Sequence, residues 1–207
     1  MLGHTLLAGI TGSGKSYAEH MMIETLIEQK AILYLVDPKR VELGKYKDKA
    51  MKYASDASDI EEVVRTAFTT MEIRLKKMEE EGKNVYDGRP VYLIIDEMLP
   101  ITSNKEMTKN GTVHFIEQIA FLGRAAKVFL IVCTQCPTRQ FLPPLIKVNL
   151  PDIICLRQKD RRDYRYVLDQ NVEPLKGKYG ECYLVKDGMP PVKMATDDAV
   201  KSIMEEV

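Results

Sequence analysis

The chain has 207 residues, 45% apolar and 29% charged, and its formal net charge is zero because 30 lysines and arginines balance 30 aspartates and glutamates. This balance excludes a protein that binds nucleic acid over its whole surface, because such proteins are strongly basic, so any contact with DNA or RNA must be local. No apolar run approaches the ~20 residues that cross a bilayer, and we expect one cytoplasmic domain over residues 1–207 without a membrane segment.

Apolar, β-rich runs alternate with helical segments along the chain. The expected strands are residues 4–8, 31–36, 91–95, 128–133 and 153–156, and two later runs, 179–185 and 192–194, predict a hairpin. The expected helices are residues 16–29, 59–81 and 113–126, the second capped by Ser58 or Asp59 and stopped by Gly82. Residues 83–90 and 100–111 are polar enough to be loops. This order predicts an α/β fold with a mostly parallel sheet and helices on both faces.

A complete phosphate-binding motif follows the first predicted strand and precedes the first helix. It matches G-x-x-x-x-G-K-[ST] and consists of Gly9, Ile10, Thr11, Gly12, Ser13, Gly14, Lys15 and Ser16. The glycines let backbone N–H groups wrap around phosphates at a helix N-terminus. Lys15 is expected to reach the β- and γ-phosphates of ATP and Ser16 to ligate Mg²⁺, with Tyr17 as a further nucleotide contact. A chance glycine-rich turn would lack this strand–loop–helix order.

Two adjacent carboxylates end the strand at residues 91–95. Asp96 is expected beside the phosphate-binding loop as a Mg²⁺ ligand, because both follow strands of a parallel sheet. Glu97 would orient or deprotonate the attacking water. An Asp-Glu pair after a strand is often only a helix-start feature, but the complete motif favours function. A glutamate at this place also favours hydrolysis over transfer to an acceptor.

The strand at residues 128–133 leads to Thr134 and Gln135. Gln135 is expected at the nucleotide side of the sheet, where it can sense the γ-phosphate or the attacking water, although a polar cap on a strand is the simpler interpretation. Cys133 and Cys136 form one C-x-x-C without a second pair at metal-ligand spacing. Their place at the end of an apolar strand favours small buried side chains in a reducing cytoplasm.

Taken together, the segments resemble the motor domain of FtsK/SpoIIIE-type DNA translocases, in the FtsK–HerA superfamily of RecA-like P-loop ATPases. The matching segments, in chain order, are HTLLAGITGSGKS, LYLVDPKRVEL, YLIIDE, GRAAKVFLIVCTQCP, LIKVNLPDIICL, DYRYVLDQ and LKGKYGECYL. The resemblance covers nearly the whole chain and implies a RecA-like ATPase. It also implies a hexameric ring that threads double-stranded DNA through its pore, with ATP hydrolysed between subunits.

The same resemblance implies roles for three arginines. Arg124 matches the arginine finger that reaches the ATP of the neighbouring subunit, whereas the bare sequence gives only an arginine at a helix end. Arg161 and Arg165 lie where the family places basic pore-loop residues, and the alternative is a charged surface loop. Further candidates for DNA contact are Lys147, Lys105 and Lys109.

Two departures from the family pattern matter. Cys136 stands where the family usually has arginine, so a basic contact is missing. The residues present also include no winged-helix domain, so we do not expect orientation-specific loading. A protein-secretion ATPase of type VII kind therefore stays open as the alternative. A P-loop kinase is disfavoured because no arginine-bearing lid is visible and Glu97 is present.

Overall fold

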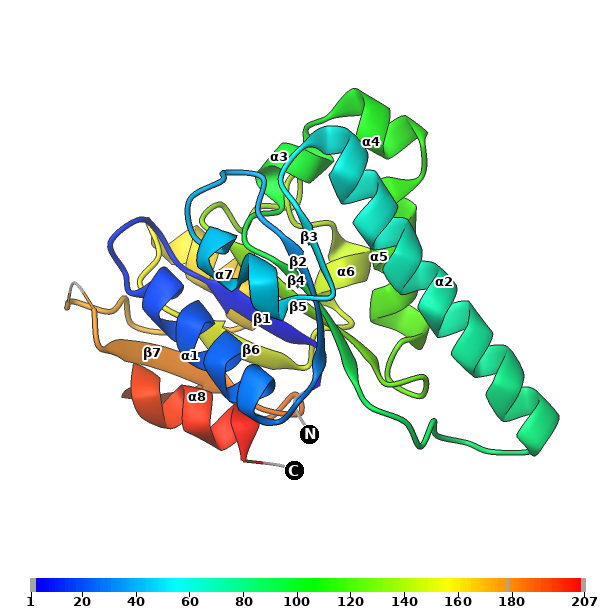
Figure 1. Ribbon diagram of the computed structural model, residues 1–207. Coiled ribbons are helices and arrows are strands. Elements are labelled where there is room, and N and C mark those ends of the chain that lie inside the picture. Colours follow the sequence, from blue (N-terminus) through cyan, green and yellow to red (C-terminus); the bar gives the residue numbers. More distant parts are fainter. Residues whose placement is uncertain (1–2, 178, 206–207) are drawn as a thin grey trace.

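A computed structural model describes residues 3–177 and 179–205 of the chain. Within these residues, eight strands form a sheet in the order β3-β2-β4-β5-β1-β6-β7-β8 (Figure 1). The strands are β1 (Thr5–Ala8), β2 (Ile32–Val36), β3 (Lys52–Ala54), β4 (Val91–Ile95), β5 (Val128–Thr134), β6 (Asp152–Cys155), β7 (Glu181–Val185) and β8 (Val192–Ala195). All pairs from β3 to β6 are parallel, whereas β6–β7 and β7–β8 are antiparallel. The predicted α/β fold with a late hairpin is confirmed.

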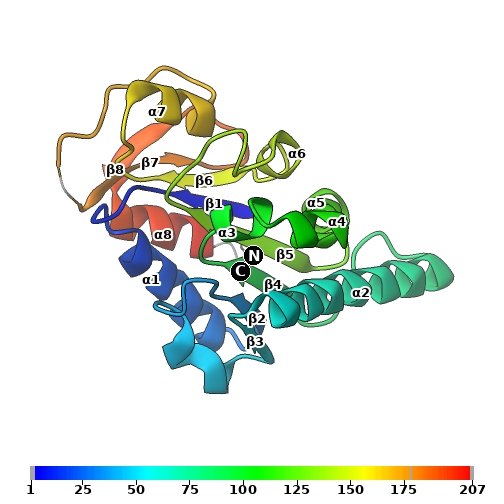
Figure 2. The same cartoon turned by 90° about the horizontal axis from the view of Figure 1, so that it is seen from above.

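Helices cover both faces of the sheet (Figure 2). One face carries α1 (Lys15–Glu28), the 3-10 helix η1 (Gly44–Lys49) and α8 (Thr196–Met204). The other carries α2 (Ala57–Glu81), α3 (Leu99–Thr102), α4 (Lys105–Lys109), α5 (Thr112–Leu122), α6 (Pro144–Lys147) and α7 (Arg161–Leu168). Successive strand residues point to opposite faces, so Leu6 belongs to one buried cluster and Leu7 to the other. Burial on both faces explains why these strands read as continuous apolar runs.

The parallel strands end together at one edge of the sheet, which we call the carboxyl edge. β1 lies between β5 and β6, and the chain leaves β1 for α1 on one face and leaves β5 for α6 on the other. Diverging connections of this kind leave a crevice at the carboxyl ends of the two strands, which is where α/β sheets bind ligands. The fold therefore brings the segments after β1, β2, β4 and β5 to one place.

Three expectations about local structure were wrong. Residues 100–111 contain two short helices, because Pro100 suits a first helical turn and the Asn104 side chain accepts from the N–H groups of Glu106 and Met107. The helix expected at 113–126 ends at Leu122, because the chain turns at Gly123, where an added Cβ would stand 2.1 Å from the carbonyl of Val128. The long helix begins at Ala57, slightly before its expected caps, and ends as predicted at Gly82.

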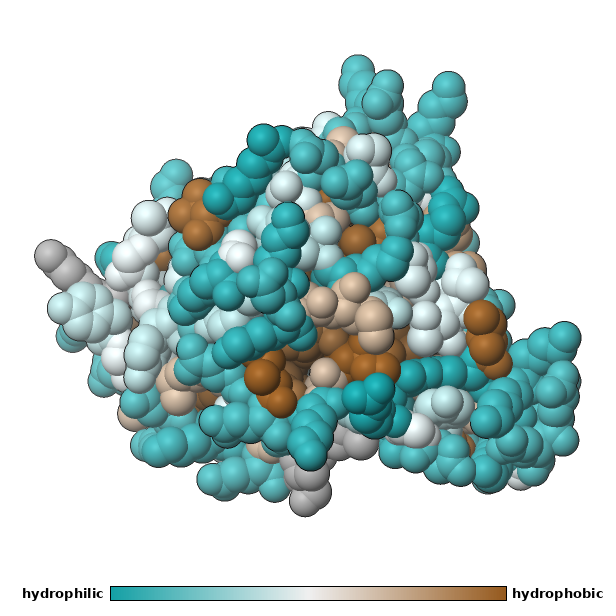
Figure 3. Space-filling view, in the orientation of Figure 1, coloured by the Kyte–Doolittle hydropathy of each residue, from teal (hydrophilic) through white to brown (hydrophobic). Residues whose placement is uncertain are grey.

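The visible outer surface of the domain is mainly polar. The face seen in Figure 3 is mainly hydrophilic, with apolar atoms gathered in the hollow between α1 and α2. The 25-residue α2 carries ion pairs such as Lys76–Glu80 and Lys77–Glu81 on its exposed side. In the part of the chain that the structure describes, no helix combines the length and the apolar character needed to cross a membrane.

Candidate nucleotide site

The loop between β1 and α1 has a backbone that requires its glycines. Gly12 and Gly14 adopt φ angles of 75° and 94°, a region that L side chains rarely enter. An added Cβ at Gly9 would stand 2.5 Å from Ser13 Oγ and 2.8 Å from Leu156 Cβ. Each motif glycine is therefore explained by its conformation or by the close approach of neighbouring atoms. The loop leads directly into the N-terminus of α1, which is the arrangement of a phosphate-binding loop.

Both neighbouring strands hold this loop in place. The N–H of Gly9 donates to the carbonyl of Thr134 at 3.0 Å, and the N–H of Ile10 donates to the carbonyl of Arg157, also at 3.0 Å. The Thr11 hydroxyl donates to Gln135 Oε1 at 3.0 Å. The loop is thus fixed by hydrogen bonds to the carboxyl ends of β5 and β6 and the residues just after them.

Lys15 and Asp96 form a buried ion pair beneath the loop. Lys15 Nζ donates to Asp96 Oδ1 at 2.6 Å and lies 3.6 Å from Glu19 Oε2. Burial opposes the charged amine, but the neighbouring Cys133, Glu19 and Asp96 together outweigh that effect and raise the pKa of Lys15. Burial also raises the pKa of Glu19 to about 8. Lys15 is therefore held in its charged form, with Asp96 as its hydrogen-bond partner.

The oxygen atoms at this place fit a Mg²⁺ ion bound together with phosphates. Asp96 Oδ2 is buried and has no hydrogen-bond partner. The Ser16 hydroxyl lies in the first turn of α1 and is a second candidate ligand. Mg²⁺ takes oxygen ligands and usually binds through one or two protein groups plus substrate phosphates. The described residues contain no group of three or more histidines, cysteines, aspartates or glutamates that would hold a metal alone.

Glu97 is buried, and three groups from the ends of two other strands fix its orientation. Thr134 Oγ1 donates to Glu97 Oε1 at 2.8 Å, and the N–H of Gln135 donates to Oε2 at 3.0 Å. Lys39, after β2, donates to the same Oε2 at 3.0 Å. A carboxylate with these partners stands in a defined position at the carboxyl edge, as a group that orients a water molecule must.

Two polar residues at this edge were given no role from the sequence. One is Lys39, and the other is Glu42, whose Oε1 accepts from the Ser16 hydroxyl at 2.8 Å. Both belong to the segment that follows β2. Part of the signal was available, because the carboxyl end of a buried parallel strand lies at the same edge of the sheet as the ends of β1 and β4, but which strand neighbours β2 depends on the strand order. Glu19 was also missed, although it stands one helical turn after Lys15 and so shares its face.

The comparison with known proteins agrees with this geometry. Residues 1–175 match the FtsK/SpoIIIE family. The chain belongs to the FtsK/SpoIIIE family. The DNA translocase FtsK of Chlorobaculum tepidum is 30% identical over 194 residues, which cover 80% of this chain and 24% of that protein. The DNA translocase FtsK of Helicobacter pylori strain J99 is 29% identical over 231 residues, covering 99% and 27%. The chain thus spans about a quarter of the length of these relatives.

Solved structures show the same fold. The pCW3 conjugation coupling protein TcpA, solved as a monomer with ATPγS, superposes with a TM-score of 0.84 at 25% identity and covers 98% of this chain and 64% of its own. ATPases 2 and 3 of EssC from Geobacillus thermodenitrificans give a TM-score of 0.73 at 16% identity, with coverage of 98% and 43%. Family membership supports ATP hydrolysis by this FtsK/SpoIIIE domain.

Arg124 lies away from the nucleotide site of its own chain. It is exposed in the turn between α5 and β5, rather than within a helix. Because β5 runs for seven residues from Val128 to Thr134 at about 3.3 Å per residue, roughly 20 Å of strand separates Arg124 from the carboxyl edge. Gln135, by contrast, lies at that edge and contacts the phosphate-binding loop through Thr11.

Basic side chains gather around α7 of this FtsK/SpoIIIE domain. Arg161 and Arg165 are exposed one turn apart on the helix. Arg165 shares a hollow of about 450 Å³ with Arg139 and Arg162, two arginines that the sequence had not singled out. Arg139 stands three residues after Cys136, so a basic group is present in the same loop although the family position is not basic.

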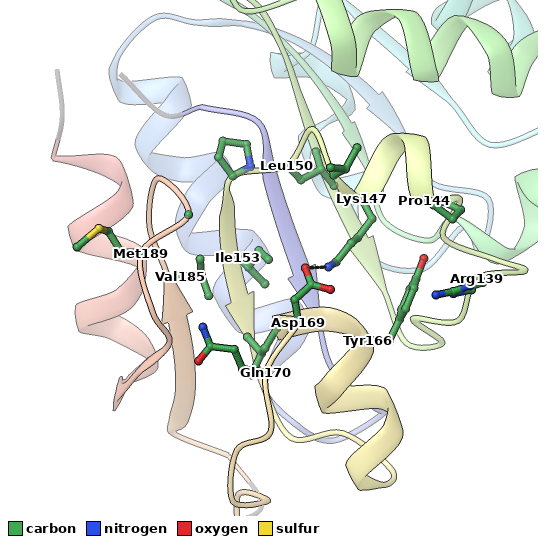
Figure 4. Close-up of a pocket in the computed structure, with 14 residues that line it drawn as sticks. Arg139, Pro144, Lys147, Leu150, Ile153, Tyr166, Asp169, Gln170, Val185 and Met189 are labelled. Carbon is green, nitrogen blue, oxygen red and sulfur yellow. Dashed lines mark hydrogen bonds and ion pairs between the residues drawn. The ribbon is translucent and has the colours of Figure 1, made fainter.

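Lys147 is not free to contact DNA. Its side chain is 9% exposed and forms an ion pair with Asp169 between α6 and α7. Figure 4 shows this pair at the centre of a cavity of about 510 Å³ under the β7–β8 turn, with Arg139 and Tyr166 at one end. The expectation that Lys147 offers an alternative DNA contact was therefore wrong, because the amine holds two helices together. Lys105 and Lys109 are exposed on α4.

Proposed function

We propose that residues 1–207 form a motor domain that hydrolyses ATP in the cytoplasm and moves double-stranded DNA, working as a ring that is hexameric in this family. The observation that carries the proposal is the carboxyl edge, where Lys15, Asp96 and Glu97 stand together beneath a glycine-rich loop. The named relatives support DNA as the cargo, since they are DNA translocases. A loop, a cation and two carboxylates in this order are the parts that nucleotide hydrolysis requires.

Each residue at the edge has a distinct task in this proposal. Lys15 would exchange Asp96 for the β- and γ-phosphates of ATP, and Asp96 and Ser16 would hold a Mg²⁺ ion, which would neutralise phosphate charge. Glu97 orients the attacking water and accepts its proton. Gln135 reports the presence of the γ-phosphate to the loop after β5, because it contacts both Thr11 and Glu97.

The proposal assigns Arg124 to the ATP of the neighbouring subunit. Its place at the far end of β5 rules out a role at its own site, and its exposure leaves the guanidinium available to another chain. An arginine supplied in this way stabilises charge on the transferred phosphate only when subunits meet. Hydrolysis would then depend on assembly.

DNA contact is assigned to Arg161 and Arg165, with Arg139 and Arg162 beside them. Duplex DNA carries one charge every ~1.7 Å, so a few well-placed cations are enough to follow its backbone. Contacts to phosphates are independent of sequence, which suits a motor that must pass over any DNA. A local cluster also fits a chain of zero net charge.

A protein-secretion ATPase is the second candidate, and two observations favour it. Cys136 occupies the place of the family arginine, and a thiol offers no positive charge to a phosphate. The neutral net charge of the chain points the same way. A polypeptide cargo would need neither an arginine at this position nor a basic surface.

The ATPase rate with and without linear duplex DNA tests the proposal. At low salt, and with assembly checked by sedimentation, we expect duplex DNA to raise the rate. Single-stranded DNA of the same length and an unstructured polypeptide are the comparison ligands. Stimulation by polypeptide alone would instead establish the secretion activity, and no ATP turnover under any condition would reject both.

A further inference from the structure

We propose that the purine ring of the nucleotide occupies a cavity of about 440 Å³ beside the phosphate-binding loop and stacks there on Tyr17 and Tyr179. This inference rests on the proposed ATPase function and names the part of the site that holds the base. Besides the two tyrosines, the cavity is lined by Gly12, Gly14, Gly180, Thr196 and Asp197.

The geometry of the loop leaves one direction for the nucleoside. Asp96 and Glu97 mark the γ-phosphate end, because they lie beneath the loop at the ends of the central strands. The side toward β6 is closed, since the N–H of Ile10 is bonded to Arg157 and the backbone of Gly9 packs on Leu156. The cavity opens on the remaining side, against Gly12 and Gly14. A triphosphate bound along the loop therefore directs its sugar and base toward the cavity.

Two large aromatic side chains stand at this cavity without being buried. Tyr17 is 55% exposed and Tyr179 is 74% exposed. An added Cβ at Gly14 would stand 3.6 Å from Tyr179 Cβ, so this tyrosine lies over the loop itself. The Tyr17 hydroxyl donates to Asp197 Oδ2 at 3.4 Å, which links the first turn of α1 to the first turn of α8. Exposed aromatic faces at the mouth of a nucleotide site are suited to stacking on a base.

The charges around the cavity match an uncharged ring rather than a phosphate. Asp197 lines it and Asp198 follows in the same helical turn of α8. Among the described residues that line the cavity there is neither lysine nor arginine. Carboxylates repel the triphosphate, while a carboxylate accepts hydrogen bonds from the N–H groups of a purine. The cavity therefore separates the base from the cationic end of the site.

Equilibrium binding of ATPγS and of inorganic tripolyphosphate, both with Mg²⁺, tests the inference by calorimetry. For Tyr17→Ala and for Tyr179→Ala we expect ATPγS to bind about 5- to 100-fold more weakly, the range for removal of one base–aromatic stack. Tripolyphosphate, which has no base, should bind as it does to the parent protein. Tyr17→Phe and Tyr179→Phe keep the ring and should bind ATPγS normally.

The matched control is Met189→Ala, which removes an exposed apolar side chain at the far end of the same hairpin and should change neither affinity. Parent-like binding of ATPγS by both alanine variants would overturn the inference and place the base elsewhere. Equal weakening of tripolyphosphate would also overturn it, because the tyrosines would then support the loop rather than the base. A parent protein that binds neither ligand would instead reject the proposed ATPase function, and this inference with it.

Discussion

Lys39 Nζ lies 3.0 Å from Glu97 Oε2, so the segment after β2 holds the carboxylate after β4. Glu97 is 3% exposed in its side chain and Lys39 is 31% exposed. A buried carboxylate that loses its cationic partner keeps its desolvation cost with less to offset it. The stability of the carboxyl edge and the position of the predicted catalytic group therefore depend on the same ion pair.

Lys39→Met is expected to lower the free energy of unfolding by about 1–3 kcal/mol, the cost of leaving a buried group short of a partner. In a Glu97→Gln background the same change should cost much less, because the neutral amide needs no counter-charge. Urea unfolding of the two single variants and the double variant measures this coupling. Equal destabilisation in both backgrounds would show that the ion pair does not couple the two residues.

Glu97→Gln should keep ATP bound while turnover falls by about 10²–10⁴-fold, because the amide cannot accept a proton. Lys15→Ala should abolish tight nucleotide binding, and Asp96→Ala should weaken the Mg²⁺ dependence of binding. Each variant is measured both for equilibrium binding and for phosphate release, with circular dichroism as the folding control. Turnover at the parent rate in Glu97→Gln would remove Glu97 from the role of base.

Specific ATPase activity should rise with protein concentration if Arg124 acts on a neighbouring subunit. Arginine fingers contribute about 10³–10⁵-fold in other P-loop enzymes, so Arg124→Ala alone should be nearly inactive. Mixing it with Lys15→Ala protein should restore part of the activity, since each supplies what the other lacks at a shared interface. An inactive mixture of two folded and associating variants would argue against a finger in trans.

Replacing Arg161 and Arg165 together by alanine should leave basal ATP turnover intact and remove stimulation by duplex DNA. The slope of log affinity against log salt should become shallower by ~0.9 for each phosphate that the variant no longer neutralises. Lys76→Ala combined with Lys77→Ala changes the charge equally on exposed α2 and should alter neither quantity. If stimulation persists, DNA binds at Arg139 and Arg162 or at Lys105 and Lys109 instead.

His4 should make the fold sensitive to mild acid. Its Nδ1 accepts from the N–H of Leu130 at 2.9 Å, and burial, aided by Arg124, lowers the pKa of His4 to about 3. Below about pH 6.5 the unfolded chain takes up a proton that the folded chain refuses. Stability therefore decreases as pH falls from 6.5 toward 3, by about 2 kcal/mol at pH 5.

The matching experiment is urea unfolding at pH 5.0 and 7.5 for His4→Asn. The Asn Oδ1 replaces the acceptor without titrating, so this variant should lose about 2 kcal/mol less than the parent between the two values. His114→Asn, at an exposed histidine, is the control and should behave as the parent. An unchanged acid sensitivity in His4→Asn would exclude His4 as the cause.

Much of the site was predictable because its residues stand directly after buried strands. The order of strand, glycine-rich loop and helix locates Lys15, and the apolar run 91–95 locates Asp96 and Glu97. β3 was missed because three residues give no periodicity, and α8 because its few apolar residues follow a strand at once. The hydrogen bond from Lys39 to Glu97 depends on β2 lying beside β4, a matter of strand order that local patterns do not reveal.

The cavity beside Tyr17 was out of reach of sequence reasoning for a related reason. Tyr17 and Tyr179 are separated by most of the chain, and they line one cavity because the fold brings the segment before β7 and the start of α8 beside the start of α1. Arg139 likewise joins Arg165 only through the loop after β5. Which residues share an edge follows from topology, whereas which residues follow a strand can be read from the sequence.

The central place of β1 has a consequence for synthesis on the ribosome. β1 pairs only with β5 and β6 among the described strands, and His4 meets Leu130 across 126 residues of chain. At about 5–20 residues per second, the first strand waits roughly 6–25 s for its first neighbour to be translated. The phosphate-binding loop cannot take its final shape during that time, so nucleotide cannot assist the early steps of folding. Until β5 is made, the apolar side chains of β1 lack the strands that cover them in the folded domain.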